Sequence, residues 1–535
     1  ASIHYQSPWW QDYAYVEDHF ARVNTAMTRG KPMIRVGVIH PIESYWLHWG
    51  PAEQTVGIRD QLDTQFQNLT DWLLNNQEQP LELDYFMIHS EGEEIPSATG
   101  HWWSNFIFSI KWFLATFSAD YASLEEYTDG GEQKVITAWI SDGRDQATIM
   151  KDMIADSFTA DTGIAVNVNL VQGGLIEAVL AGTAPDVAIN VARGQPVNLA
   201  SRSALMDLTQ FKELDTVRQR FTDDALMPYT YRDGVYALPM TQTYQVMFYR
   251  TDIFRELELE VPQTWQEFMD VAAVLQRNNM KVGLPYTAIT ATGAVEVGVG
   301  AKDLYPTLLM QGGGSFYNKD LTATALDNQQ ALEAFETWTG FYTDYGFDLS
   351  YDFATLFRSG EMPMCITAYP MYGTLSAVAT EIRGCWEMTV LPGTVQEDGS
   401  INRTAGASGS AAVILRDAKD PDACWQFLEW FTRKDTQADY GNRLENQLGE
   451  AARYASANLS AVELLNWSSR EKEVLRNQRQ WVREIPEIPG SYYTSRCMDN
   501  AFRSVIYDGD NPRKVFEKQV EIIDSELKRK RLELE

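Results

Sequence analysis

The stretch VITAWISDGRDQATIMKDMIADSFTADTGIAVNVNL, residues 135–170, decides the fold class of this chain. Its first six residues are mostly apolar or β-branched, which is typical of a strand. Ile149, Met153 and Phe158 then recur at the helical spacing that places them on one face. Residues 166–170 alternate between apolar and polar, as in a second strand. A strand, a helix and a strand in this order predict α/β layering.

The same pattern continues toward the C-terminus. Residues 175–180 predict a short helix, and residues 186–191 predict a buried strand. Thr264 and Glu267 form a capping box, in which each side chain satisfies a free backbone amide at the start of a helix. Pro512 opens a last helix, because proline fits the first turn. Residues 133–535 are therefore expected to be α/β throughout.

The chain is long, acidic and rich in aromatic residues. Its 535 residues exceed one hydrophobic core and indicate about three compact units. The 44 Lys and Arg against 74 Asp and Glu give a net charge of −30. This charge repels phosphate backbones, so nucleic acid is not expected as a partner. The 16 Trp and 25 Tyr supply flat apolar faces with polar edges, which suit sugars.

Histidine and cysteine usage limits the chemistry. All six histidines lie in the first 101 residues, so His-dependent acid–base chemistry and the commonest zinc ligand are excluded from residues 133–535. No metal and no cofactor is expected there. The four cysteines show no metal-ligand spacing and leave the redox compartment open; they are Cys365, Cys385, Cys424 and Cys497.

The first 132 residues differ from the rest. Residues 34–39 and 83–88 predict two strands around a helix, a single β-α-β unit. Such a unit cannot cover both faces of a parallel sheet, so it must dock on another element or be incomplete. The apolar run at residues 102–117 is shorter than a bilayer span and predicts a buried or interfacial amphipathic helix, with a membrane anchor as the alternative.

Several short motifs carry a resemblance to a known family. They are GTAPDV (182–187), DGVYALP (233–239), FYRTDIFRELELEVPQTWQEF (248–268), FRSGEMPMCI (357–366), WEMTVLPG (386–393) and CWQFLEWF (424–431). Their order resembles the family 1 extracellular solute-binding proteins of ABC importers, the maltose-binding-protein-like family. The resemblance runs from about residue 134 to the end and implies a two-lobed periplasmic-binding-protein fold with hinge crossings.

The resemblance implies a division of the chain into lobes. Lobe 1 would comprise residues 133–245 and 393–445, and lobe 2 would comprise residues 246–392 and 446–535. Crossing strands are expected within these segments, at Tyr244–Tyr249 and Met388–Pro392. The hinge positions would absorb the bend while each lobe moves as a rigid body.

Ahead of the lobes, residues 91–132 are expected to form a linker and the amphipathic helix. Residues 1–90 are expected to form the β-α-β fragment, in which RVGVIHPIESYWLHWGP (35–51) resembles a segment of large bacterial glycoside hydrolases with a flavodoxin-like accessory domain. Glycoside hydrolysis commonly needs two carboxylates about 5–10 Å apart. Glu43 has no persuasive partner, so a hydrolase-related module is an alternative rather than the main expectation.

The family resemblance implies a function without catalysis. It implies capture of a carbohydrate, an oligosaccharide in particular, and delivery to an ABC permease in the membrane by a monomeric protein. No secretory signal is visible after Ala1, so an extracytoplasmic location, periplasmic or on the cell surface, rests on the resemblance alone. A surface protein that has lost its ligand and only docks to a partner is a further alternative.

Candidate ligand contacts lie where predicted strands end. Sugars need aromatic planes for their C–H faces and planar polar groups for their hydroxyls, and open α/β sheets bind ligands at the carboxyl ends of strands. Residue chemistry points to Arg144, Asp145 and Ser408 as contacts. The family resemblance implies the other predicted contacts, which are Asn190, Gln242, Tyr244, Tyr369, Tyr372, Tyr492, Tyr493 and Arg496. Helix capping by Asp142 or Asp145 is an alternative role. Core packing is the alternative for the tyrosines.

Overall fold

The computed structural model describes residues 106–107, 134–171, 173–284, 304–349 and 351–534. Apart from residues 106–107, these belong to one compact unit, Phe113–Glu535. The β-α-β fragment and nearly all of the linker region expected before residue 133 lie outside the described residues.

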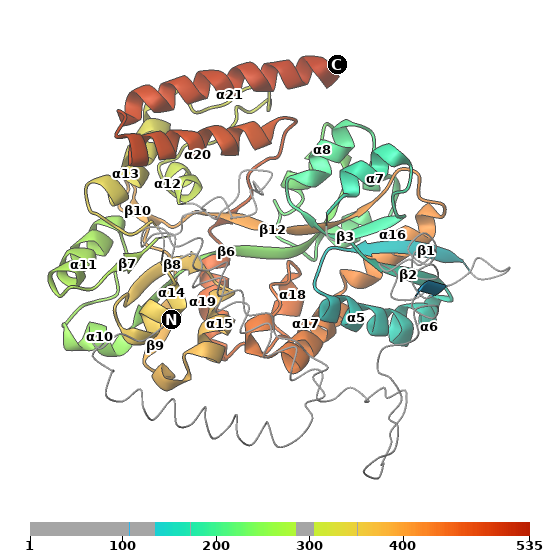
Figure 1. The fold of residues 1–535 in the computed structure, drawn as a ribbon, viewed down its shortest axis with the longest axis horizontal. Helices are drawn as coiled ribbons and strands as arrows, with labels where there is room; N and C mark the ends of the chain where they lie inside the picture. The colour runs from blue at the N-terminus through green and yellow to red at the C-terminus, as the bar shows by residue number, and fades with distance from the viewer. Residues whose placement is uncertain (1–105, 108–133, 172, 285–303, 350, 535) are drawn as a thin grey trace, which may run out of the picture. The chain divides into compact units, whose positions relative to one another are not determined.

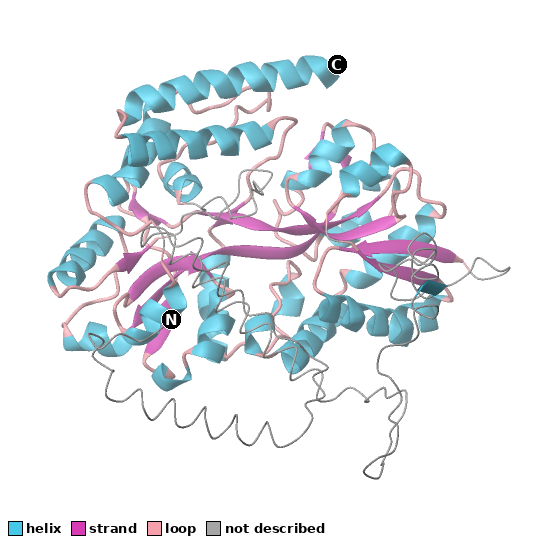
Figure 2. Ribbon diagram, in the orientation of Figure 1, coloured by secondary structure: helices cyan, strands magenta, loops and turns pink. Residues whose placement is uncertain are grey.

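The first lobe begins with the α/β layering that the sequence predicts. Its strands are parallel in the order β2-β1-β3, and β1 alternates between half-buried and buried residues. Its helices flank these strands in Figures 1 and 2. The main elements are β1 (Val135–Ile140), α5 (Arg144–Met153), β2 (Ala165–Leu170), α7 (Leu175–Ala181), β3 (Val187–Ala192), α8 (Gln195–Ser201), α9 (Leu214–Arg218), β4 (Thr230–Tyr231), β5 (Gly234–Val235), α16 (Pro421–Phe431) and α17 (Lys434–Leu448).

The predicted face of the first helix is buried as expected. Ile149 and Met153 lie on α5, and Phe158 lies on the π-helical turn Ile154–Thr159 that extends it. All three are at most 4% exposed. The three-residue helix α6 (Ala160–Thr162) then leads to β2.

The second lobe combines a smaller sheet with more helices. Its elements are α10 (Thr251–Glu256), α11 (Trp265–Arg277), β7 (Val282–Gly283), α12 (Tyr305–Gln311), α13 (Gln329–Thr343), α14 (Phe353–Ser359), β8 (Met364–Ala368), α15 (Met371–Val378), β9 (Trp386–Thr389), β10 (Thr394–Val395), β11 (Ile401–Asn402), α19 (Ser469–Arg479), β13 (Val482–Arg483), α20 (Ser491–Asp508) and α21 (Pro512–Leu534). The short helix α18 (Leu459–Val462) packs against α17 of the first lobe. The capping box of Thr264 and Glu267 is confirmed at the start of α11.

Two long strands carry one sheet through both lobes, in the order β2-β1-β3-β12-β6-β8-β7. The first half of β6 (Leu238–Arg250) pairs with β12 (Ala405–Ile414), and its second half pairs with β8 and β9. The crossing predicted at Tyr244–Tyr249 is therefore part of β6. The return crossing predicted at Met388–Pro392 is wrong, because β9 pairs only with the second-lobe half of β6, whereas β12 pairs with both β3 and β6.

Small side chains allow β12 to lie close against β6. Residues 405–412 of β12 read AGASGSAA. A Cβ atom added at Gly409 would lie 2.0 Å from the carbonyl oxygen of Thr241 on β6, so only glycine fits at this point. The close approach occurs in the middle of the crossing, where the two strands run side by side (Figure 1).

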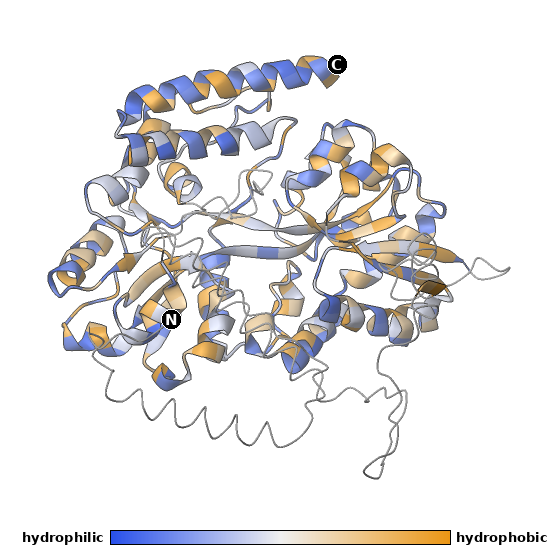
Figure 3. Ribbon diagram, in the orientation of Figure 1, coloured by the Kyte–Doolittle hydropathy of each residue, from blue (hydrophilic) through white to orange (hydrophobic). Residues whose placement is uncertain are grey.

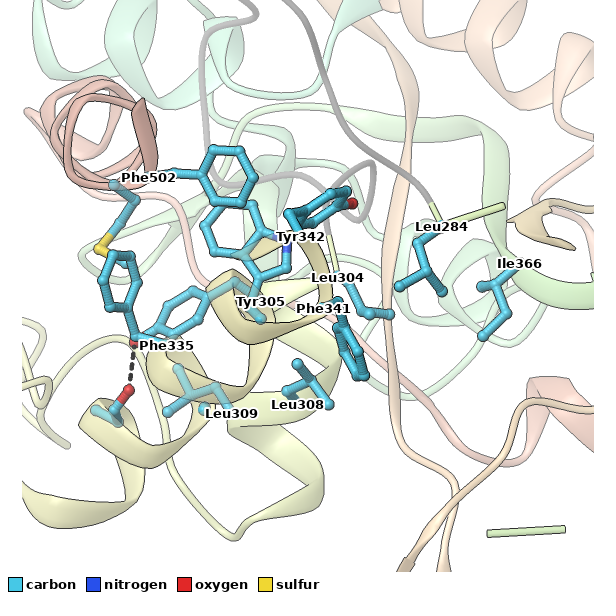
Figure 4. Close-up of a cluster of buried hydrophobic side chains, with 14 of the residues drawn as sticks. Leu284, Leu304, Tyr305, Leu308, Leu309, Phe335, Phe341, Tyr342, Ile366 and Phe502 are labelled. Atoms are coloured by element: carbon cyan, nitrogen blue, oxygen red, sulfur yellow. Dashed lines mark hydrogen bonds between the residues drawn. The ribbon is translucent and has the colours of Figure 1, made fainter. Parts of the chain in front are cut away.

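Each lobe has its own apolar core. Figure 3 shows the mainly hydrophobic strands of the first lobe and helices with one hydrophobic and one hydrophilic side. The second-lobe core is strongly aromatic, as Figure 4 shows around Tyr305, Phe335 and Phe502. The rings of Trp338 and Phe502 lie 4.1 Å apart, and Trp338 is 2% exposed. Burying such a side chain fully stabilises the fold by about 1.5–3 kcal/mol.

The C-terminal helix α21 closes this core as the sequence predicts. Its stripe of Phe516, Val520, Ile523 and Leu527 is buried, and α20 and α21 lie side by side (Figure 1). No helix among the described residues combines the length and the apolar content that crossing a membrane requires. All four cysteines are free thiols.

Candidate functional site

The ends of β1 and β3 bring a carboxylate and an amide together. Asn190 Nδ2 donates a hydrogen bond to Asp142 Oδ1. Asn190 has a left-handed backbone with φ 59°, a conformation that asparagine tolerates better than most residues. Burial raises the pKa of the Asp142 carboxyl to about 6, although the hydrogen bond from Asn190 lowers it. These two groups form one wall of a pocket.

Two tyrosines face this carboxylate. Tyr440 lies on α17, and Tyr454 follows that helix in the chain. Burial raises the pKa of both phenols, and the charge of Asp142 raises each pKa further. Together these groups line a pocket of about 260 Å³ whose other lining residues are Gln146, Met240, Thr241, Leu444, Ala451, Ala452, Arg453 and Ala455. Planar polar groups beside phenol rings are the combination that sugar hydroxyls and C–H faces require.

Arg453 also lines a second pocket, which lies in the second lobe. The second pocket has a volume of about 470 Å³, and both pockets include Arg453 in their lining. The Arg453 guanidinium forms an ion pair with Glu445 at 2.5 Å and lies over the ring of Trp467, 4.6 Å from its centroid. This fixed position leaves an arginine between the two pockets. Lining residues of the second pocket include Tyr372, Trp386, Glu387, Arg470 and Glu471.

Two of the predicted contacts line these pockets. Asn190 lies in the first pocket and Tyr372 in the second. The Tyr372 hydroxyl donates to Glu471, and its ring lies 5.0 Å from that of Trp386. Arg144 and Asp145 begin α5 beside the first pocket and are exposed, but neither lines it. The alternative role for Asp142 or Asp145, capping of α5, is not found, because Gly143 occupies the N-cap position and its backbone amide donates a hydrogen bond to Gln146 Oε1.

Tyr244 and Tyr369 meet in the core beneath the site. They are 1% and 2% exposed, and their ring centroids lie 4.8 Å apart. The Tyr244 hydroxyl donates to the carbonyl of Leu475 at 3.0 Å, and the Tyr369 hydroxyl donates to that of Gln242 at 3.1 Å. Their burial agrees with core packing, which is the alternative role given above for the predicted tyrosines. Ligand contact by either ring stays a prediction.

Gln242 and Ser408 lie on the crossing strands. Gln242 is 3% exposed, and its Nε2 donates to Glu484 Oε1 at 2.8 Å. Ser408 is half-buried opposite Thr243, whose hydroxyl donates to the Ser408 carbonyl at 3.4 Å. Neither residue lines the two pockets described above, so their ligand contacts stay predictions.

The last three predicted contacts lie on α20. The rings of Tyr492 and Tyr493 lie 4.3 Å apart, and Arg529 of α21 donates to the Tyr493 hydroxyl at 3.2 Å. Arg496 is exposed. These side chains do not line the pockets that hold Asn190 and Tyr372.

Sequence reasoning missed Tyr440, Arg453 and Tyr454. They come from a segment that follows Asp142 by about 300 residues, and no motif marks them. The dipeptide Arg453–Tyr454 carries no sequence signal of its own that distinguishes it from a surface pair.

A buried ion pair links the lobes near the crossing. Arg193, after β3, pairs with Glu484, after β13, at 3.1 Å, and both side chains are at most 7% exposed. Arg193 also donates to the Ala407 carbonyl at 2.7 Å and to that of Ile485. Burial raises the pKa of Glu484, although the charge of Arg193 lowers it. Among the described residues, no three His, Cys, Asp or Glu side chains gather as metal ligands would.

Two α/β lobes, joined by crossing strands and carrying polar, aromatic pockets beside them, define a periplasmic-type solute-binding fold. The family model of bacterial extracellular solute-binding proteins matches residues 153–458, and the chain belongs to this family. The predicted resemblance and fold class are thereby confirmed for this part of the chain. The chain has no match among curated protein sequences.

Solved sugar-binding proteins share the fold at low sequence identity. The sugar-binding protein MalE of Xanthomonas citri is 15% identical, with a TM-score of 0.60 over 75% of this chain and 98% of that one. The cyclic α-maltosyl-1,6-maltose binding protein of Arthrobacter globiformis is 17% identical, with a TM-score of 0.60 over 74% and 100%. The maltose-binding MalE of Listeria monocytogenes, in complex with maltose, is 16% identical, with a TM-score of 0.55 over 75% and 99%.

Proposed function

We propose that this protein binds a carbohydrate, an oligosaccharide in particular, at the two pockets that share Arg453. It delivers the sugar unchanged to an ABC permease from the periplasm or the cell surface. Membership of an extracellular solute-binding family and the fold shared with sugar-binding proteins support this proposal.

The observation that carries the proposal is the first pocket. Asp142 and Asn190 line it with a carboxylate and an amide, and Tyr454 and the 2% exposed Tyr440 line it with phenols. The Asp142 carboxylate accepts hydrogen bonds from hydroxyls, and the rings cover apolar C–H faces. The second pocket, which has a volume of about 470 Å³ and is lined by Tyr372 and Trp386, shares Arg453 with the first and offers room for a further sugar unit.

The first pocket, taken by itself, favours binding over hydrolysis. A glycosidase needs a raised-pKa acid and a second carboxylate across the bond. The first pocket offers Asp142 as its only carboxylate among the described lining residues. Glu43, the acid that suggested a hydrolase-related module, lies outside the described residues.

Calorimetry of the purified full chain with maltose, the cyclic maltosyl-maltose and mannobiose tests the proposal. We expect saturable binding of at least one sugar, which chromatography then recovers intact. Released monosaccharide would support the hydrolase-related alternative. Absence of binding across the panel, with the protein folded, would favour the docking protein and overturn the sugar-binding proposal.

A matched pair of variants locates the site. Asn190→Gly keeps the left-handed backbone and removes the amide, so we expect sugar affinity to fall about 5- to 10-fold, about 1–1.4 kcal/mol for a lost hydrogen bond. Asn279→Gly is the control, because Asn279 is exposed at the end of α11 with φ 57°. Equal sugar affinity in both variants would place the ligand elsewhere.

A further inference from the structure

A third pocket, of about 500 Å³, shares no lining residue with the two pockets of the candidate site. Its first-lobe wall is Met227 and residues 230–232. Its second-lobe wall comprises residues 319–322 and 487–489 together with the end of α21. Small-molecule sites commonly have volumes of about 300–1,000 Å³ and apolar walls with a few placed polar groups.

The lining of the third pocket is mainly apolar. Met227 and Leu321 are 40% and 42% exposed, although large apolar side chains gain free energy by leaving water. The other apolar lining residues of this pocket come from other elements. The apolar lining residues include Met227, Tyr231, Leu321, Ile488, Leu527 and Leu534.

Two lining residues hold a backbone conformation that disfavours them. Arg232 has φ 54° and Leu321 has φ 53°, and the left-handed region costs free energy for any residue with a bulky side chain. Glycine or asparagine would relieve this cost. The chain instead keeps an arginine and a leucine, one on each wall, and both side chains line the same pocket.

Basic groups surround the apolar lining in a chain whose net charge is −30. Arg232, Lys319 and Arg531 are exposed lining residues. Of the two lining carboxylates, Glu487 is 2% exposed and accepts a hydrogen bond from Ser491 at 2.5 Å, and Asp320 is exposed to solvent. Three exposed basic side chains against one exposed carboxylate leave the rim positively charged, which favours an anionic group, and the walls favour an apolar body.

We propose that the third pocket is a second ligand site, which takes a small amphiphilic carboxylate. Its apolar body lies between Leu321 and the α21 residues Leu527 and Leu534, and its carboxylate lies between Arg232 and Arg531. This inference goes beyond the proposed sugar binding and does not depend on it, because the two sites share no residue.

Fluorescence titration of the full chain with 8-anilinonaphthalene-1-sulfonate tests this site, because the dye combines an aromatic body with an anionic group. We expect saturable enhancement that decanoate reverses and that 1-decanol, at equal concentration, does not. Absence of saturable enhancement would overturn the proposal. Equal displacement by decanol would refute recognition of the carboxylate.

Matched asparagine variants place the dye. Arg232→Asn and Leu321→Asn keep a residue that tolerates positive φ, and we expect each to weaken dye affinity about tenfold. Glu258→Asn is the control, because Glu258 is exposed with φ 53° outside the pocket. Dye binding that is equal in all three variants would mean that the dye lies elsewhere, which overturns the assignment. Sugar titrations of the same variants report separately on the proposed function.

Discussion

Replacing Arg193 with methionine should destabilise the protein strongly and in a pH-dependent way. The guanidinium is the cation of the buried pair with Glu484, at 3.1 Å, and both groups are at most 7% exposed. Arg193→Met fills similar space and leaves the Glu484 carboxylate buried without its ion-pair partner. Breaking a buried pair in this way costs about 3–5 kcal/mol.

The pH dependence follows from the pKa of Glu484. Burial already raises this pKa, and the charge of Arg193 opposes the rise. Without Arg193 the folded-state pKa rises further above the unfolded value, so the folded variant gains a proton. A group with a raised folded-state pKa contributes its stability at low pH and loses it as pH rises through that pKa. The deficit of the variant should therefore be larger at pH 8 than at pH 5.

Urea denaturation at both pH values measures this deficit, with Glu484→Gln and the double variant completing a cycle. We expect the double variant to recover part of the loss, because the Glu484 carboxylate is gone and Gln242 Nε2 still finds an acceptor in the new amide. Recovery stays incomplete because Glu487, which is 2% exposed and also interacts with the Arg193 charge, remains buried. A deficit below about 1 kcal/mol, the scale of an exposed pair, would refute a desolvated ion pair between the lobes. A deficit that is equal at both pH values would refute the role assigned to Glu484.

Three further perturbations test the site and the crossing. Asp142→Asn should raise the melting temperature at pH 8 and not at pH 4, because the folded-state pKa of about 6 makes the charged form unfavourable above that pH; a gain at pH 4 would contradict this. Sugar affinity of the unsubstituted protein should change with a midpoint near pH 6, and calorimetry of the variant should show no such step. Tyr369→Phe should cost about 1 kcal/mol by removing the bond to Gln242, whereas Tyr369→Ala should cost about 3–5 kcal/mol in urea denaturation through a core cavity; equal losses would mean that the ring packs loosely. Gly409→Ala should lower stability by more than about 2 kcal/mol, because its Cβ would lie 2.0 Å from the Thr241 carbonyl; a neutral effect would mean that β12 shifts freely.

Local chemistry made much of the fold predictable. Periodicity identified β1 and the face of α5, and the capping box placed the start of α11, because these features depend on residues near in sequence. The return crossing was misplaced at Met388–Pro392. The run AGASGSAA of β12 has almost no strand-forming side chains, and its extended conformation depends on partners on both sides.

The candidate site was predictable only in part. Asn190 was expected from the family resemblance and from its place near the carboxyl end of a predicted strand, and it lines the first pocket. Its partners Tyr440, Arg453 and Tyr454 arrive through long-range packing of α17, which local spacing cannot indicate. Tyr244 and Tyr369 were predicted as ligand contacts because they are aromatic, and both lie in a buried core cluster. The sequence could not separate the two roles, since composition does not distinguish a ring that stacks on a ligand from one that packs in the core.

The pairing of β12 with β3 also constrains the order in which the newly made chain can fold. When β3 leaves the ribosome, about 210 more residues must be synthesised before its neighbour β12 exists. At cellular rates of 5–20 residues per second this synthesis takes about 10–40 s. Throughout that interval the edge of β3 offers unpaired amides and carbonyls, the exposure that promotes association between chains. Nascent copies of this protein therefore need that edge shielded until Ala405–Ile414 has been made, and truncation before residue 405 should yield an aggregating product rather than a folded half.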